Sequence, residues 1–165
     1  MITFAELRMA TSPLTRTVER SLPSSLAGGY IEFIQQVLSE LTKLGWQQRD
    51  LFGVQMALEE TISNGIRHGN KEDPNKLVHV QCRLGPNRFW AQIRDEGKGF
   101  FPDSVPDCCC AENLEAPGGR GLTLIRGFMT RVSYNECGNC ITLEKRLDSG
   151  NSSTCHTRST SPPPK

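Results

Sequence analysis

Two polar side chains between residues 57 and 70 have the spacing and the chemistry of a small active site. Glu60 and Asn64 are four residues apart, which puts both side chains on one face of a helix. The amide oxygen of Asn64 can ligate a hard cation such as Mg²⁺, and the carboxylate of Glu60 can orient or deprotonate a nucleophile. His68 follows one turn later, and Gly69 is a natural helix stop. The pair suits chemistry on a phosphate group if the rest of the chain supplies a site for one.

The same helical face has a second interpretation, as ordinary solvated surface. The apolar stripe of this helix consists of Leu51, Val54, Leu58 and Ile62. Each helical residue turns by about 100°, so Glu60 lies about 200° away from Leu58. A charged face turned to solvent has the same pattern, and the helix alone leaves both interpretations open.

A second carboxylate, Asp95, stands at the end of a strand with an apolar inner face. The preceding inward residues of this strand are Phe89, Ala91 and Ile93, and Asp95 continues their parity. A buried carboxylate is costly without a hydrogen-bond donor, so we expect Asp95 to meet one. Gly97 and Gly99 follow directly and allow a tight turn with close approach of a ligand to the backbone.

A third stretch, the glycine-rich residues 118–122, leads into an apolar helix. Free N–H groups and the helix dipole make such an entry a ready anion site. Glycine-rich segments also serve as plain hinges, so this signal is weak when taken alone.

The remaining pattern predicts one domain over residues 15–147, preceded by an arm at 1–14 and followed by a disordered Ser/Thr/Pro tail at 148–165. We expect an edge strand at 15–22, a helix at 25–44 capped by Ser24 or Ser25, and a helix at 47–68. Two hairpins follow, over 78–95 and 132–143.

Composition and charge exclude several classes of protein. The 165 residues carry a net charge of +1, which gives no electrostatic footprint for nucleic acid or an anionic membrane. No apolar run approaches a membrane span and no signal peptide is recognisable, so a cytoplasmic protein is expected. The seven cysteines are an odd number, which argues against a disulfide framework. Metal binding by Cys137, Cys140 and the 108–110 triplet is the less favoured interpretation, because zinc usually takes two spaced pairs.

Taken in order, the three stretches resemble the Bergerat ATP-binding fold of gyrase, histidine kinases and MutL. Glu-Glu-Thr-Ile-Ser-Asn-Gly-Ile-Arg-His-Gly-Asn, Asp-Glu-Gly-Lys-Gly-Phe and Gly-Arg-Gly-Leu-Thr-Leu-Ile-Arg-Gly-Phe-Met are closest to the bacterial anti-sigma factor serine/threonine kinases. The resemblance covers about residues 15–147. It implies an α+β two-layer sandwich, in which a mixed, mostly antiparallel sheet is covered on one face by about three helices.

The resemblance also implies residue roles. Asn64 would hold the Mg²⁺ that bridges the phosphates of ATP, and Glu60 would be the general base, with Glu59 as second choice. Asp95 would accept a hydrogen bond from the adenine amino group, beside Gly97 and Gly99. The lid over the phosphates would be formed by Gly119, Arg120, Gly121 and Leu122. His68 would approach the phosphates or merely complement the helix dipole.

The function implied is a kinase that phosphorylates a serine or threonine of an anti-anti-sigma (STAS-type) partner and sequesters a sigma factor. Such proteins are typically homodimers, and we expect neither nucleic acid nor membrane as a partner. Two alternatives remain: a partner-switching module that binds ATP without turnover, and a detached histidine-kinase catalytic domain. Retention of Glu60 favours the kinase. The absence of a phosphoacceptor helix before the domain disfavours the third hypothesis.

Overall fold

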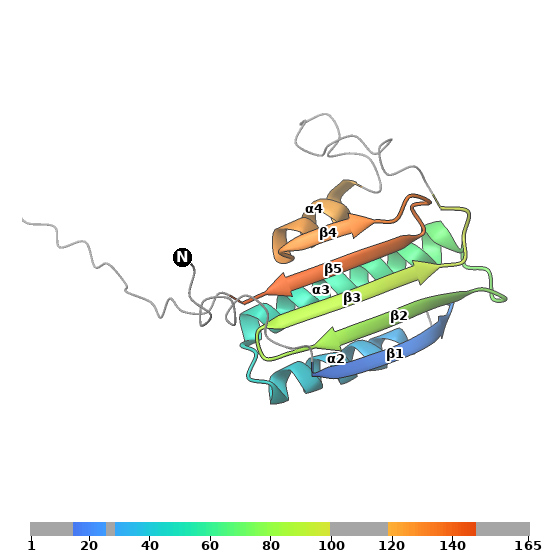
Figure 1. The fold of residues 1–165 in the computed structure, drawn as a ribbon. Helices are drawn as coiled ribbons and strands as arrows, with labels where there is room; N and C mark the ends of the chain where they lie inside the picture. The colour runs from blue at the N-terminus through green and yellow to red at the C-terminus, as the bar shows by residue number, and fades with distance from the viewer. Residues whose placement is uncertain (1–14, 26–28, 100–118, 148–165) are drawn as a thin grey trace, which may run out of the picture.

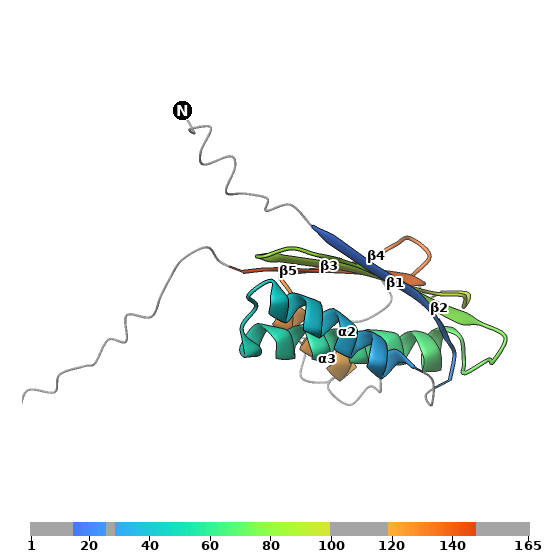
Figure 2. The same ribbon diagram turned by 90° about the horizontal axis from the view of Figure 1, so that it is seen from below.

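The structure, a computed structural model, describes residues 15–25, 29–99 and 119–147. It has two layers, a five-stranded sheet and a layer of helices on one face of that sheet (Figures 1 and 2). The strand order is β1-β2-β3-β5-β4, and all four described pairings are antiparallel. The predicted α+β two-layer architecture is therefore confirmed, with an antiparallel rather than a mixed sheet.

Each strand has one face in the core and one outside it. The strands are β1 (Arg16–Pro23), β2 (Leu77–Leu84), β3 (Arg88–Asp95), β4 (Arg131–Tyr134) and β5 (Cys140–Arg146). On β2 and β3 the period-2 pattern holds, because Val78, Val80, Cys82, Leu84, Phe89, Ala91 and Ile93 are all buried. The expected edge strand is β1, which pairs only with β2 within the described sheet.

The helical layer consists of α2 (Tyr30–Lys43), α3 (Gln48–Asn64), a π-helical turn η1 (Gly65–Gly69) and α4 (Gly119–Phe128). The predicted helix at 47–68 is thus two segments. In η1 the N–H of Asn70 donates to the carbonyl of Gly65, five residues earlier, at 2.8 Å. Periodicity at 3.6 residues cannot reveal this change, since the apolar pattern continues through Ile66, which is fully buried.

The predicted serine cap of the first helix is wrong. The N-cap of α2 is Gly29, in a left-handed conformation and without a side-chain cap. Ser24 is instead buried, where its hydroxyl accepts a 2.6 Å hydrogen bond from Nδ2 of Asn70. The buried amide of Asn70 needs a hydrogen-bond acceptor, so Ser24 binds Asn70 and does not cap the helix as the local sequence pattern predicts.

The core lies between the sheet and the helices. The predicted stripe of α3 is confirmed, because Leu51, Val54, Leu58 and Ile62 are all buried. Among the described residues, no helix combines the length and the apolar character needed to cross a membrane. The expected arm at 1–14, the cysteines at 108–110 and the tail at 148–165 lie outside the described residues.

Candidate functional site

A cavity of about 600 Å³ opens where η1, the turn after β3 and the β4–β5 hairpin meet. This volume is in the range of small-molecule sites. Its described lining consists of Thr61, Asn64, Gly65, His68, Gly69, Lys71, Lys76, Ile93, Asp95, Lys98, Gly99, Tyr134, Gly138, Asn139, Cys140 and Ile141. The predicted residues Asn64, His68, Asp95 and Gly99 therefore share one cavity, although they come from two separate segments of the chain.

The end of α3 brings Asn64 to this cavity in a defined orientation. Its Nδ2 donates a 3.0 Å hydrogen bond to Oε1 of Glu60, one turn earlier. The oxygen and nitrogen of an amide diverge from one planar carbon, so with Nδ2 bonded to Glu60 the Oδ1 of Asn64 is turned from that carboxylate. That oxygen is the group that a hard cation requires.

Asp95 lines the same cavity beside the η1 turn, and it meets the hydrogen-bond donor expected from the sequence. Its Oδ1 accepts a 2.8 Å hydrogen bond from the N–H of Gly97, and its own N–H donates to the carbonyl of Asn139 at 3.0 Å. Burial raises the pKa of the Asp95 carboxyl above its ordinary value. The N–H of Gly97 and the charge of Lys76 oppose part of that rise.

Glycine is required at three positions around Asp95. A Cβ at Gly69 would collide with the Asp95 carboxylate, and one at Gly97 would collide with the carbonyl of Gly69. Gly99 has a φ of 75° and packs against the carbonyl of Cys137. Gly97 thus allows close approach of two protein segments and does not line the cavity, whereas Gly99 does.

A buried amide that sequence reasoning missed holds this arrangement together. Asn70 is 1% exposed, and its Oδ1 accepts the N–H of Glu96 at 2.7 Å. Its Nδ2 donates to Ser24 and also to the carbonyl of Leu77 at 2.9 Å. One side chain therefore joins the end of η1 to three strand ends, including the turn that carries Asp95. Its position directly after the predicted helix stop was the only signal available.

Three lysines, also missed from the sequence, give the cavity a positive rim. Lys71, Lys76 and Lys98 line it, whereas Asp95 is the only carboxylate among the described lining residues. Lysines in turns read from sequence as ordinary solvated residues, and only the fold gathers them. A cavity with one carboxylate acceptor and a cationic rim suits an anionic ligand that also carries a hydrogen-bond donor.

Glu60 does not line this cavity. Its carboxylate lies against Gly121, in the first turn of α4, where a Cβ would collide with it. The first turn of a helix favours nearby negative charge, and the Glu60 carboxylate supplies such a charge beside Gly121. Its neighbour Glu59 accepts a 2.9 Å hydrogen bond from Gln55 and is also outside the described lining.

The glycine-rich segment is placed only in part. Gly119 and Arg120 are the first two residues of α4, and their side-chain surroundings lie outside the described residues. Gly121 and Leu122 do not line the cavity, and Leu122 is 9% exposed. Of this segment, the structure thus places Gly121 against Glu60 and leaves Gly121 and Leu122 outside the described cavity lining.

The cysteine pair has no described metal partner. Cys137 and Cys140 are free thiols, and no cluster of three or more His, Cys, Asp or Glu residues suited to a metal ion occurs in the described ranges. Cys137 is exposed on the β4–β5 hairpin, as the expected turn requires. The less favoured cysteine-metal hypothesis gains no support from these residues.

Comparison with known proteins identifies similar chains. The model of the histidine kinase-like ATPase domain family matches residues 23–145. An anti-sigma F factor from Heyndrickxia coagulans is 32% identical over 105 residues, covering 59% of this chain and 71% of the relative. The serine-protein kinase RsbW of Staphylococcus aureus (strain JH9) is 25% identical over 139 residues, covering 79% and 86%.

A solved structure shares the fold. The crystal structure of the RsbU and RsbW domains of a Mycobacterium tuberculosis protein superposes with a TM-score of 0.50 at 17% identity. The match covers 81% of this chain and 33% of that longer chain. At this identity the likeness supports the architecture alone.

Proposed function

This chain belongs to the histidine kinase-like ATPase domain family, and on that basis we propose that it is an anti-sigma regulatory serine/threonine protein kinase. It binds Mg-ATP, transfers the γ-phosphate to a serine or threonine of an anti-anti-sigma partner, and sequesters a sigma factor. Relatives named as anti-sigma F factor and as serine-protein kinase support both parts of this proposal.

One observation carries the nucleotide assignment: Asp95 and Asn64 line a single cavity whose rim holds three lysines. Asp95 can accept a hydrogen bond from an exocyclic amino group such as that of adenine. The lysines and Asn64 suit the negative charge of a triphosphate and its metal ion. The apolar residues Ile93 and Ile141 line the same cavity and supply surface for a flat base.

The residues present fit a magnesium ion. Mg²⁺ in nucleotide sites usually keeps several waters and takes only one or two protein oxygens in addition to phosphate. Asn64 offers one such oxygen, directed away from Glu60 by the hydrogen bond between them. When bound, the ion would neutralise charge on the transferring phosphoryl group.

Transfer itself would be mostly positioning and charge neutralisation. The partner's hydroxyl oxygen forms the new bond to the γ-phosphorus, the bond to the β–γ bridging oxygen breaks, and Glu60 takes the hydroxyl proton. Asn64 holds Glu60 through its Nδ2. For Glu60 to reach a hydroxyl, the first turn of α4 must move away from it, because Gly121 packs against the carboxylate.

We place the protein in the cytoplasm, where a sigma factor and its regulators act, and we propose a homodimer as its working form. Residues 15–147 form the proposed ATP-binding domain, with the arm and tail outside it. Gly119 and Arg120 retain their proposed part in the lid over the phosphates.

A second function is favoured by one specific observation. Because Glu60 is held by Asn64 and covered by Gly121, the chain could bind ATP and switch partners without turnover. A detached histidine-kinase domain has no such observation in its favour.

The deciding experiment incubates the full chain with γ-labelled ATP, Mg²⁺ and each candidate partner encoded beside it. We expect acid-stable label on a serine or threonine of one partner, and no label when Asn64→Ala is used. Saturable ATP binding without label supports the non-catalytic module. Label on a histidine would overturn the kinase assignment, and failure to bind ATP would overturn both functions.

A further inference from the structure

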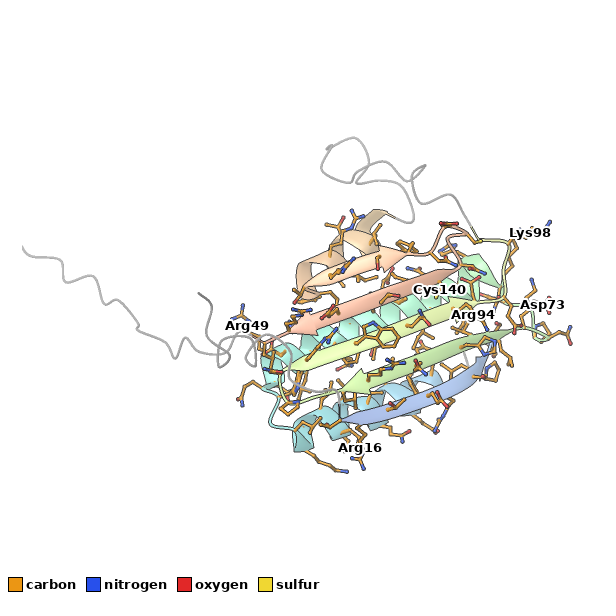
Figure 3. The ribbon with its side chains drawn as sticks, viewed as in Figure 1. Arg16, Arg49, Asp73, Arg94, Lys98 and Cys140 are labelled. Atoms are coloured by element: carbon orange, nitrogen blue, oxygen red, sulfur yellow. The ribbon has the colours of Figure 1, made fainter. Side chains whose placement is uncertain are left out.

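The face of the sheet opposite the helices carries a concentration of positive charge. No described helix covers this face (Figure 2), and Figure 3 looks onto it, with Arg94 on β3 beside Cys140 on β5. Its outward residues, which alternate with the core residues, include Arg83, Arg88, Arg94, Arg131 and Arg146. The strands contribute Glu19 and Glu144 as acids to the same face, and Glu96, directly after β3, pairs with His79 on it. With a net charge of +1 for the whole chain, this distribution is uneven.

The strand register arranges part of this charge in a row across the sheet. Arg83 pairs with Trp90, Trp90 with Glu144, and Glu144 with Arg131, on four successive strands. The guanidinium of Arg83 lies over the Trp90 ring, 4.9 Å from its centroid. In this row the Trp90 ring and the buried Glu144 carboxylate therefore lie between Arg83 and Arg131.

Glu144 is already neutralised from within the face. It is 8% exposed, and its Oε1 accepts hydrogen bonds from Nε of Arg88 at 2.8 Å and Nε of Arg146 at 2.6 Å. Burial opposes its ionisation, but the two arginines hold its pKa below the ordinary value. Glu144 consequently fixes Arg88 and Arg146 and leaves the charges of Arg83 and Arg131 uncompensated by it.

A hollow of about 320 Å³ lies beside this row. It is lined by Arg88, Trp90, Arg131, Ser133, Thr142 and Glu144. Arg131 is exposed and makes no hydrogen bond or ion pair with the residues that the structure describes. Ser133 and Thr142 face each other across β4 and β5 and add two hydroxyl groups. An unengaged guanidinium beside hydroxyls and a tryptophan is a recognition surface for a carboxylate.

We propose that this open sheet face docks an acidic segment of a partner protein, with Arg83 and Arg131 pairing its carboxylates on either side of Trp90. An apolar partner surface does not fit, because Trp90 is the only aromatic or aliphatic side chain that faces outward from β3 and β5. A second copy of this chain would present the same positive face and be repelled. The surface is separate from the cavity that holds Asp95, so the proposal goes beyond nucleotide binding.

The test uses fluorescein-labelled poly-L-glutamate of about 20 residues and its anisotropy with the full chain. We expect saturable binding that weakens as ionic strength rises. We expect Arg83→Gln/Arg131→Gln to raise the apparent Kd about tenfold, as the loss of two charge pairs implies. The matched control is Arg49→Gln/Arg67→Gln, which removes the same charge from α3 (Figure 3) and η1 and should leave the Kd unchanged.

Trp90 reports the location of binding independently of the anisotropy. The second tryptophan, Trp46, is 3% exposed and its Nε1 donates to the carbonyl of Gly85, so a binding-dependent change in emission should vanish in Trp90→Phe. ATP affinity of the arginine variants should match that of the parent, and thermal unfolding should change only slightly, through the lost contact between Arg83 and Trp90. If the double variant does not fold, Arg131→Gln alone, which breaks no described contact, should raise the Kd about threefold, roughly half the effect in free energy.

Four outcomes would overturn the proposal. Equal weakening in the Arg49/Arg67 control would show that only net charge matters. Tighter binding of a DNA duplex than of polyglutamate would assign the face to nucleic acid. Dissociation of a dimer by the Arg83/Arg131 change would assign it to a second copy of the chain. Absence of saturable binding at low salt would remove the docking site altogether.

Discussion

The carboxylate of Glu60, near the end of α3, lies directly against the backbone of Gly121, in the first turn of α4. Seven residues away in each helix, Gly53 contacts Phe128, so the two helices run antiparallel with a glycine at each close contact. A Cβ at Gly53 would be 3.2 Å from Cδ1 of Phe128. This packing connects the proposed base to the glycine-rich segment that the sequence assigned to the phosphates.

The contact predicts a specific coupling between residues 60 and 121. Gly121→Ala should push the Glu60 carboxylate aside, break its hydrogen bond to Asn64 and lower the free energy of unfolding by about 1 kcal/mol. In the Glu60→Ala background the same substitution should cost little, because the obstructing atoms are gone. Urea unfolding of the parent, the two single variants Gly121→Ala and Glu60→Ala, and the double variant measures this double-mutant cycle. Gly127→Ala is the control, since a Cβ there meets no atom within 4 Å. Additive effects in the cycle would contradict the contact.

Asn64 and Glu60 should differ in what they contribute to the reaction. We expect Asn64→Ala to lose Mg-dependent ATP binding, because its Oδ1 is the proposed magnesium ligand. Glu60→Ala should retain ATP affinity and lose phosphate transfer to the partner. Calorimetric titration with and without Mg²⁺, beside the labelling assay, separates the two. Equal losses of ATP affinity in both variants would refute the division of roles.

Asp95→Asn should weaken ATP binding by about 1.5–3 kcal/mol, the range for a hydrogen bond that involves a charged group. The asparagine oxygen can still accept the N–H of Gly97, so the turn after β3 should survive. Affinities for ATP and for inorganic triphosphate provide the measurement and its control. If Asp95 binds the base, the triphosphate affinity should not fall; an unchanged ATP affinity would exclude Asp95 as the base-binding group.

The same variant should change how stability depends on pH. Burial raises the pKa of Asp95 in the folded chain, so the folded state holds this proton more tightly than the unfolded state. The free energy of unfolding must then fall as pH rises from the ordinary pKa of aspartate to the raised pKa of Asp95. Below that pH window Asp95 is protonated in both states and does not lower the free energy of unfolding. Asp95→Asn removes this loss, so its stability relative to the parent should be greater at neutral pH than at about pH 3. Urea unfolding across this range checks the sign, and a difference independent of pH would contradict it.

Local patterns were sufficient to predict most of the elements. The alternation of Val78, Val80 and Cys82 and the stripe from Leu51 to Ile62 identify core faces, because side-chain direction follows directly from backbone period. The order of the three polar and glycine-rich stretches identified the family that the matched model confirms. Asp95 could be singled out because a carboxylate ends an otherwise apolar strand face, and Asn64 because its four-residue spacing puts it on the helical face of Glu60.

Other features depend on contacts between distant segments, and only the tertiary structure decided them. Ser24 serves Asn70 rather than α2, because a buried amide from another element competes for it. Glu60 lies against Gly121 instead of on the cavity wall. Position 97 requires glycine because a Cβ there would collide with the carbonyl of Gly69. Lys71, Lys76 and Lys98 become a cationic rim only once the turns that carry them converge. The sequence by itself determined which faces are apolar and which residue types are available. Long-range packing determined which of those residues meet, since close approach and burial arise only when the layers come together.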